Sequence, residues 1–303
     1  PALAQYTKNA IKYISSFSYY EENIDNDQNI HLKSYREEIL PYSTLLIKFN
    51  FEPQEIRRIL IDAKAPFWGS KRPSTLVWFI HQSGSKKTFS NNDDFDLLNT
   101  FNEYAKFRGL PVTEPILDLN EISILNDEKN WDEIYNDIYL SSEKYKSDII
   151  YIIKFNELSE GGWIALSSMK YENEIIKHDF MGEDINQFLK NNLNYLASKL
   201  AEKFSITGSN TYTNENYIIK ISNINNYKQF SYLTQSLSSI SALRPLKVKK
   251  INNEELYFSF PSSIQLKKLI TIMSLNDRLI RIDQSLNLIP HGPVDLSYKW
   301  NDK

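Results

Sequence analysis

Few side chains in this sequence have the types and spacing that chemistry requires. The four histidines, His31, His81, His178 and His291, show neither H-x-x-x-H nor H-E-x-x-H spacing, so no metal site is predicted. The chain has no cysteine, which excludes disulfides, thiolate zinc sites and cysteine nucleophiles. It also lacks a G-x-S-x-G elbow, a Walker loop and a G-x-G-x-x-G motif. We therefore expect no catalytic residues and no cofactor.

Two carboxylates, Asp118 and Glu121, have the best claim to catalysis. They follow a strand expected near 112–117, and sites in α/β proteins gather at the carboxyl ends of parallel strands. The same residues suit the N-cap and first turn of a helix, which is the interpretation we favour. A second acidic run, 91–96, resembles a calcium loop but lacks the central glycine and terminal glutamate of an EF-hand. A capped helix start explains that run better.

The most specific local feature is the loop Trp68-Gly69-Ser70-Lys71-Arg72-Pro73. Lys71 and Arg72 could hold an anion or an acidic partner surface. In the structural interpretation, which we favour, Trp68 plugs the end of a core while both cations face water.

The elements around these residues alternate from residue 44 onward. Strands are expected at 44–51, 75–80, 112–117 and 148–155, with helical spacing between them, which favours a largely parallel sheet with packed helices. Gly161-Gly162 then indicates a hairpin, so the sheet becomes mixed. The predicted fold class is α/β and α+β, with a mixed, partly parallel sheet followed by a ferredoxin-like β-α-β-β-α-β domain.

This reading divides the chain into five parts. They are an N-terminal strand and loop segment (1–43), an α/β domain (44–205), a polar linker (206–214), the ferredoxin-like domain (215–284) and an irregular tail (285–303). In the ferredoxin-like domain, we expect partner or anion binding on the face bearing Tyr257 or at the edge strand near Lys247 and Lys249.

Composition narrows the class of protein. Of 303 residues, 41% are hydrophobic and 24% charged, which are globular values. The net charge of -3 gives no reason to expect nucleic acid, because phosphate contacts dominate that affinity. No apolar run approaches the roughly 20 residues of a transmembrane helix. The chain begins with Pro1 and not Met, so we expect that processing or trimming removed an upstream segment.

The loop also carries a family resemblance. Pro66-x-Trp68-Gly69-x-x-Arg72-Pro73, the run 75–78, Arg108-Gly109-Leu110-Pro111 and Trp131 together resemble an uncharacterised proteobacterial family of exported proteins. It is the domain-of-unknown-function family numbered two thousand sixty-six, and the resemblance covers about residues 10–285. It implies a periplasmic location with the signal peptide removed, and no known activity. Residues 131–204 resemble more weakly the N-terminal domain of TolB, an envelope protein.

Three hypotheses follow for function. The leading one is a non-enzymatic envelope protein that binds or scaffolds other envelope or inner-membrane proteins. The alternative is a hydrolase-type enzyme that uses carboxylates near Asp118 and Glu121, and it requires a cleft around them. The third is a lipid- or glycan-binding module, which requires tryptophan or tyrosine rings along an open groove.

Overall fold

The computed structural model describes residues 3–23, 43–69, 71–90, 97–125, 129–159, 161–207, 216–261, 264–282 and 294–302. The polar segment 24–29, the acidic run 91–96, most of the predicted linker, His31 and His291 lie outside these residues. The chain divides into two units, Pro1–Phe67 with Thr207–Thr211, and Trp68–Ile206 with Tyr212–Lys303.

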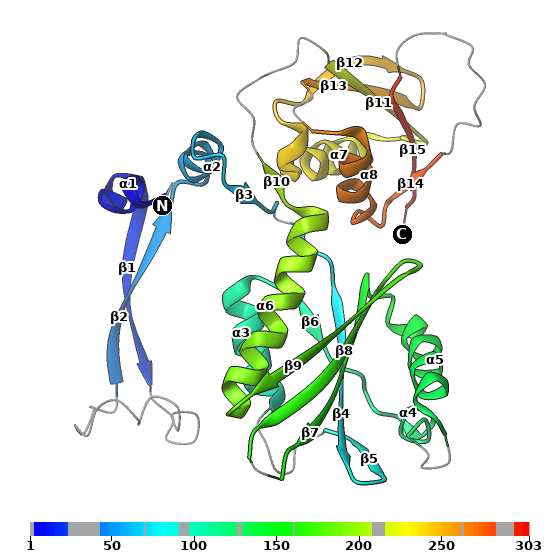
Figure 1. Ribbon diagram of the computed structural model, residues 1–303. Coiled ribbons are helices and arrows are strands. Elements are labelled where there is room, and N and C mark those ends of the chain that lie inside the picture. The colour runs from blue at the N-terminus through cyan, green and yellow to red at the C-terminus, as the bar shows by residue number, and fades with distance from the viewer. Residues whose placement is uncertain are drawn as a thin grey trace. The chain divides into compact units, whose positions relative to one another are not determined.

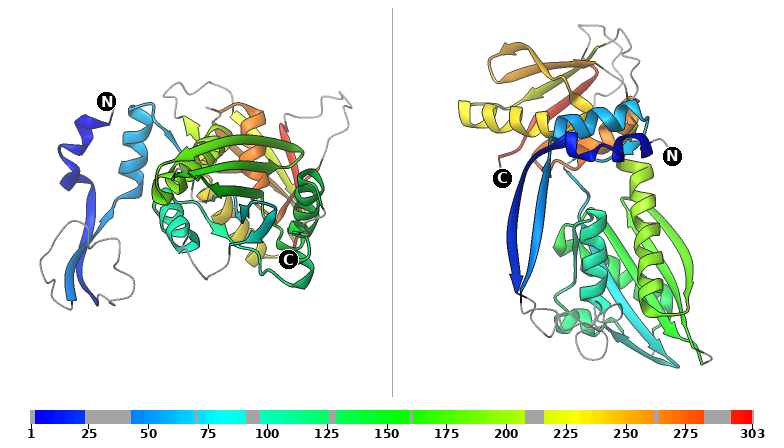
Figure 2. Two further views of the ribbon diagram at one scale, coloured as in Figure 1. Left: turned by 60° about the horizontal axis from the view of Figure 1, so that its bottom comes forward. Right: turned by 90° about the vertical axis from the view of Figure 1, so that its left-hand side faces the viewer.

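The first unit is built around a two-stranded antiparallel ribbon, which Figure 2 shows as a long hairpin. Pro53 opens its longest helix at a position where the missing N–H costs nothing. Ile59 is the one buried hydrophobic side chain among the described residues of this unit. Its elements are α1 (Ala4–Thr7), η1 (Ala10–Tyr13), β1 (Ile14–Asn23), β2 (Ser43–Phe51), α2 (Pro53–Asp62) and β3 (Pro66–Phe67).

The pairing of β2 corrects a prediction. We expected the strand at 44–51 to open the α/β sheet, but β2 pairs with β1 over its whole length. The physical reason lies in its pattern, because a strand inside a parallel sheet is apolar on both faces whereas this one alternates. The boundary expected at residue 43 therefore falls inside the first unit.

The second unit begins with an α/β part whose sheet is mixed, as predicted. Strand β4 runs parallel to β6 and β7, whereas β5, β8 and β9 join by antiparallel pairing, in the order β5-β4-β7-β8-β9 with β6 beside β4. The elements are β4 (Thr75–Ser83), β5 (Lys86–Phe89), α3 (Leu97–Arg108), β6 (Val112–Thr113), α4 (Leu119–Ile122), α5 (Trp131–Ser141), η2 (Ser142–Tyr145), β7 (Ile149–Glu157), β8 (Trp163–Tyr171), β9 (Glu174–Gly182), α6 (Ile185–Phe204) and β10 (Ile206–Thr207).

This sheet has a core on each face. Val77 and Phe79 of β4 pack with α3 and α6, while Leu76 and Trp78 point to the other side and pack with α5. Figure 1 shows α3 and α6 on one side of the sheet and α5 on the other. The run 76–80 is apolar at every position because both of its faces are covered.

The C-terminal part of the second unit has a five-stranded sheet in the order β12-β13-β11-β15-β14. The β-α-β-β-α-β order occurs, but β15 lies between β11 and β14, parallel to β11. The predicted ferredoxin-like plan has four strands, whereas this sheet has a fifth strand, β15, between the first (β11) and the fourth (β14). The elements are β11 (Asn216–Ser222), α7 (Tyr227–Ser239), η3 (Ser241–Leu243), β12 (Lys247–Asn252), β13 (Glu255–Pro261), α8 (Leu266–Ser274), β14 (Leu279–Arg281) and β15 (Leu296–Trp300).

Strand β15 corrects a second prediction, the irregular tail at 285–303. Leu296, Tyr298 and Trp300 alternate along it and are all buried in the C-terminal core. We predicted an irregular tail because of Pro290, Gly292 and Pro293. We therefore missed the period-two alternation of the short strand that follows them. None of the described helices is long and apolar enough to cross a bilayer.

Candidate functional site

Within the loop at 68–73, the Arg72 side chain contacts Trp68 and Gly69. The Arg72 guanidinium carbon lies 4.3 Å from the centroid of the Trp68 ring, and Arg72 Nε donates to the Gly69 carbonyl at 3.1 Å. Trp68 packs against the core beneath α3 and α6, and Arg72 lies beside Gly109, where α3 has ended. Burial lowers the pKa of Arg72. These contacts support the structural interpretation of Trp68 and Arg72.

Lys71 is directed differently from its neighbour Arg72. Its pKa is lowered first by burial, while the Asp277 carboxylate raises it and the Arg278 guanidinium lowers it further. Lys71 therefore lies within the electrostatic reach of the turn between α8 and β14. Lys71 and Arg72 are neighbours in the sequence but have different electrostatic surroundings in the structure.

Asp118 and Glu121 do come together, as the cap of α4. Each side chain accepts the backbone N–H of the other at 3.0 Å, and Lys144 Nζ lies 2.6 Å from Asp118 Oδ2 and 2.8 Å from Glu121 Oε1. Tyr145 Oη also donates to Glu121 Oε1, at 2.7 Å. Ser141, at 3.5 Å, completes the surroundings of a carboxylate with no exposed surface.

The pKa values of this cluster follow from its hydrogen bonds. The bond from Lys144 is the main cause that lowers the pKa of Asp118. Burial acts to raise the pKa of Glu121, but bonds from Lys144, Tyr145 and the Asp118 N–H outweigh it and leave that pKa lowered. Both groups are thus held as carboxylates with their acceptor positions occupied, which suits a structural clamp.

The candidate residues of the C-terminal sheet lie on its edge strand β12 and on the neighbouring strand β13. Lys247, Lys249 and Lys250 are exposed on β12, and the register places Lys250 opposite Tyr257. Tyr257 Oη donates to a Glu255 oxygen at 2.8 Å, and Lys220 pairs with the same carboxylate at 2.6 Å. Lysines along an open edge prevent edge-to-edge association, which is a sufficient structural reason for this row.

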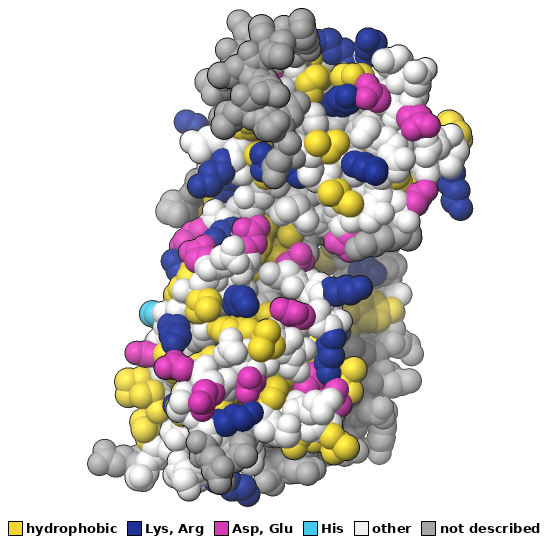
Figure 3. All heavy atoms as spheres, turned by 90° about the vertical axis from the view of Figure 1, so that its right-hand side faces the viewer, with side chains coloured by type: hydrophobic (Ala, Val, Ile, Leu, Met, Phe, Trp, Pro, Cys, Tyr) yellow, Lys and Arg dark blue, Asp and Glu magenta, His cyan; other side chains and the backbone are white. Residues whose placement is uncertain are grey.

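Histidines and tryptophans in the described residues are largely occupied by packing. His81 stacks on Phe155 with ring centroids 5.2 Å apart, and His178 stacks on Tyr195 at 4.2 Å. No group of three metal-binding side chains occurs among the described residues. Figure 3 shows cations and carboxylates interspersed over one face of the second unit, with no extended basic patch on that face.

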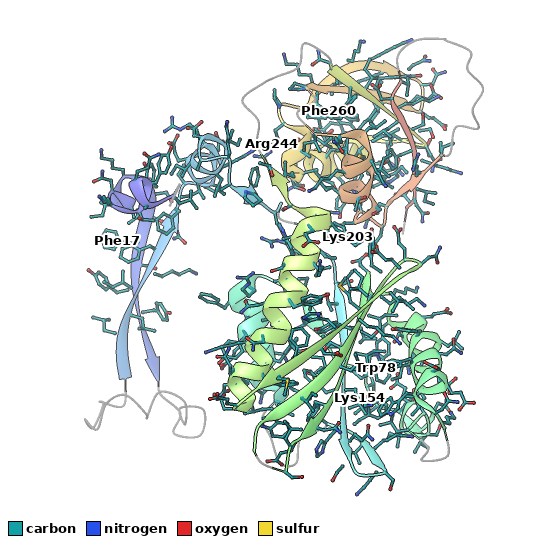
Figure 4. All side chains as sticks on the ribbon, in the orientation of Figure 1. Phe17, Trp78, Lys154, Lys203, Arg244 and Phe260 are labelled. Carbon is teal, nitrogen blue, oxygen red and sulfur yellow. The ribbon has the colours of Figure 1, made fainter. Side chains whose placement is uncertain are left out.

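Four of the five tryptophans, Trp68, Trp78, Trp131 and Trp163, do not form the open groove that the glycan or lipid hypothesis requires. Trp78 and Trp163 are buried, while Trp68 lies under Arg72, and the ammonium of Lys154 lies 4.0 Å from the ring centroid of Trp131. Figure 4 labels Trp78 and Lys154 in the α/β part. Cations therefore cover the two partly exposed rings.

The most unusual surface is one that sequence reasoning missed as a site. One face of the β1–β2 hairpin carries large apolar side chains, because Phe17 pairs with Phe49 and Tyr19 with Ile47, while the register places Glu21 opposite Leu45. We call it the hairpin apolar face, and Figure 4 labels Phe17 on it. Its members and their exposed fractions are Phe17 60%, Tyr19 60%, Leu45 64%, Ile47 46% and Phe49 49%.

The opposite face of the hairpin is mainly polar. Ser16, Ser18, Lys48 and Asn50 lie on it, together with the pair Tyr20 and Leu46, and Asn50 Nδ2 donates to Ser16 Oγ at 3.0 Å. The alternation of both strands was visible in the sequence. Because we expected residues 44–51 to belong to the main sheet, we expected their apolar side to be buried and did not identify it as a surface.

Comparisons with known proteins add little to this geometry. No protein-family model matches the chain, and no curated protein matches it. A solved structure described as an uncharacterized protein aligns with 43% of this chain and 95% of its own length, at 12% identity and a TM-score of 0.16. A likeness that low carries no argument about fold or function.

Proposed function

We propose that this chain is a non-enzymatic binding protein of the cell envelope that docks another protein on the hairpin apolar face. The observation that carries the proposal is the exposure of Phe17, Tyr19, Leu45, Ile47 and Phe49 on one side of a two-stranded ribbon. The envelope location rests on the family resemblance in the sequence.

The size of the face supports an interaction role. Large side chains of this kind bury about 150–250 Å² each, so five of them at about half exposure offer roughly 500 Å². The largest exposed apolar patch of a typical monomer has about this size and is often functional. A two-stranded hairpin is also only marginally stable alone in water, so packing on this face would stabilise it.

The chemistry of the hairpin favours a protein as the occupant. None of the five side chains is charged, so a complementary surface is apolar over them, with the register placing one acidic residue, Glu21, opposite Leu45. In the described residues β1 and β2 pair only with each other, so each strand has an outer edge with unpaired backbone groups. A protein partner can satisfy those groups with an added edge strand and pack other apolar side chains on the face, whereas lipid tails cannot satisfy the backbone groups.

Photocrosslinking tests this proposal with a matched pair of positions. A photoreactive phenylalanine analogue at position 17 lies on the apolar face, and the same group at position 18 lies on the polar face one residue away. We expect position 17, in cells, to yield a discrete protein adduct that position 18 does not. Adducts at both positions alike, adducts with lipid alone, or adducts only with a second copy of the chain would each overturn the proposal.

The hydrolase alternative gains no support from the geometry of Asp118 and Glu121. A general acid or base needs a pKa near the working pH, whereas both pKa values are lowered.

A further inference from the structure

The C-terminal part of the second unit has an open cleft of about 480 Å³ beside the first turn of α7. Ligand sites have volumes of about 300–1,000 Å³ and combine aromatic walls with a few convergent polar groups. Residues from α7, the turn before β14 and the end of β15 line this cleft, and Figure 1 shows these elements. Those that matter to the argument are Lys228, Gln229, Tyr232, Arg278, Trp300 and Asp302.

Arg278 is the distinctive group of the cleft. Its guanidinium carbon lies 4.4 Å from the ring centroid of Tyr232 and 5.7 Å from that of Trp300. In the part of the chain that the structure describes, no carboxylate lies within ion-pair distance of this guanidinium. A guanidinium stacked on aromatic rings keeps the N–H groups of its edge available for an oxyanion.

The floor of the cleft is fixed by hydrogen bonds. Trp300 is 1% exposed, and its Nε1 donates to Asp302 Oδ1 at 3.0 Å. Gln229, which is also buried, donates to the other oxygen of Asp302 and accepts the backbone N–H of Asn225 at 2.7 Å. Asp302 therefore has hydrogen-bond partners of its own and forms no ion pair with Arg278.

The net charge around the cleft favours an anion. Lys228 is exposed on the rim and Arg278 lines the cleft, so two cations face the one carboxylate of the lining, Asp302, which accepts two hydrogen bonds of its own. Tyr232 is 47% exposed and forms an aromatic wall beside Arg278. A ligand with an acidic group and a planar or apolar body would contact both the cation and the wall.

We propose that this cleft binds a small organic molecule through a carboxylate or phosphate group, which Arg278 holds by paired N–H···O bonds. Carboxylate and phosphate groups each present two oxygens at a spacing that the guanidinium fork matches. This site is independent of the hairpin apolar face, so either can fail alone.

The indole N–H of Trp300 provides the test, because it lies in the floor of the cleft and gives its own signal in ¹⁵N NMR spectra. The intact chain is titrated with benzoate and with phenyl phosphate, and neutral benzamide is the control ligand. We expect a saturable shift of the Trp300 signal with one or both anions and none with benzamide. The anion that binds more tightly identifies the acidic group.

Variants then assign the shift to Arg278. Arg278→Gln should weaken binding at least about tenfold, since a charge-assisted pair is lost. Arg281→Gln, which removes the same charge from β14 outside the cleft, should bind as the wild type does. The other indole signals report folding, and Arg278→Lys, which keeps the charge without the fork, should still bind more weakly than the wild type. Equal binding by Arg278→Gln, equal binding of benzamide, or no shift with either anion would overturn the proposal.

Discussion

Replacing Glu121 by glutamine tests how much the contacts of its carboxylate stabilise the α/β part. Glu121 Oε2 accepts the Asp118 N–H, and Oε1 accepts both Lys144 Nζ and Tyr145 Oη. A glutamine has one oxygen and one NH₂ group, so a donor must face another donor on one side. The other carboxylate, Asp118, is replaced by asparagine as the control, because asparagine caps a helix about as well as aspartate.

The expected magnitude follows from burial. Glu121 has no exposed surface, and leaving a buried donor without an acceptor costs about 1–3 kcal/mol. Urea unfolding followed by circular dichroism at pH 7 should therefore show Glu121→Gln less stable than the wild type by about that amount. Asp118→Asn should stay close to the wild type, since Asp118 is largely exposed and its capping bond is kept.

The pH dependence of the Glu121 variant provides a second check. The folded-state pKa of Glu121 is lowered, so its stabilisation is complete above the unfolded-state value of about 4.3 and is lost as the pH falls through the folded-state value. The difference between wild type and Glu121→Gln should shrink in that acid range. A variant as stable as the wild type at pH 7, or a difference that does not change with pH, would refute the clamp interpretation.

Three further predictions concern packing and the hairpin. Ser142→Ala removes the acceptor of the buried Trp78 indole at 3.0 Å and should cost about 1–3 kcal/mol in urea unfolding, and no loss would contradict it. Trp300→Ala should cost about 3–5 kcal/mol if β15 closes the C-terminal core, whereas an irregular tail would tolerate it. Phe17→Glu should lower the fluorescence of an apolar dye bound to the chain, whereas Ser18→Glu on the other face should not, and equal effects would contradict the exposure of that face.

Local patterns predicted most elements of the fold. The strand at 75–80 and the Gly161-Gly162 hairpin rest on short-range signals, and the structure has both. The partner of β2 could not be read in this way. Periodicity shows which face of a strand is apolar, but not which distant strand pairs with it.

The candidate site likewise combines a local feature that the sequence predicts with long-range contacts that it does not predict. The cap formed by Asp118 and Glu121 is a local signature and was predicted. Lys144 and Tyr145, which decide the protonation of those carboxylates, are more than twenty residues away and reach them only through the fold. The loop at 68–73 was recognised, but not that Arg72 turns to Trp68 while Lys71 lies near Arg278.

The affinity of the crosslinked partner for matched hairpin variants tests the central claim most directly. The dissociation constant is measured with the purified full chain, with Phe17→Glu, which places a charge on the apolar face, and with Ser18→Glu, which places the same charge on the polar face. An aromatic residue central to an interface contributes about 2 kcal/mol or more, so Phe17→Glu should weaken binding at least about thirtyfold while Ser18→Glu stays close to the wild type. Equal affinities for the two variants would contradict docking on the hairpin apolar face.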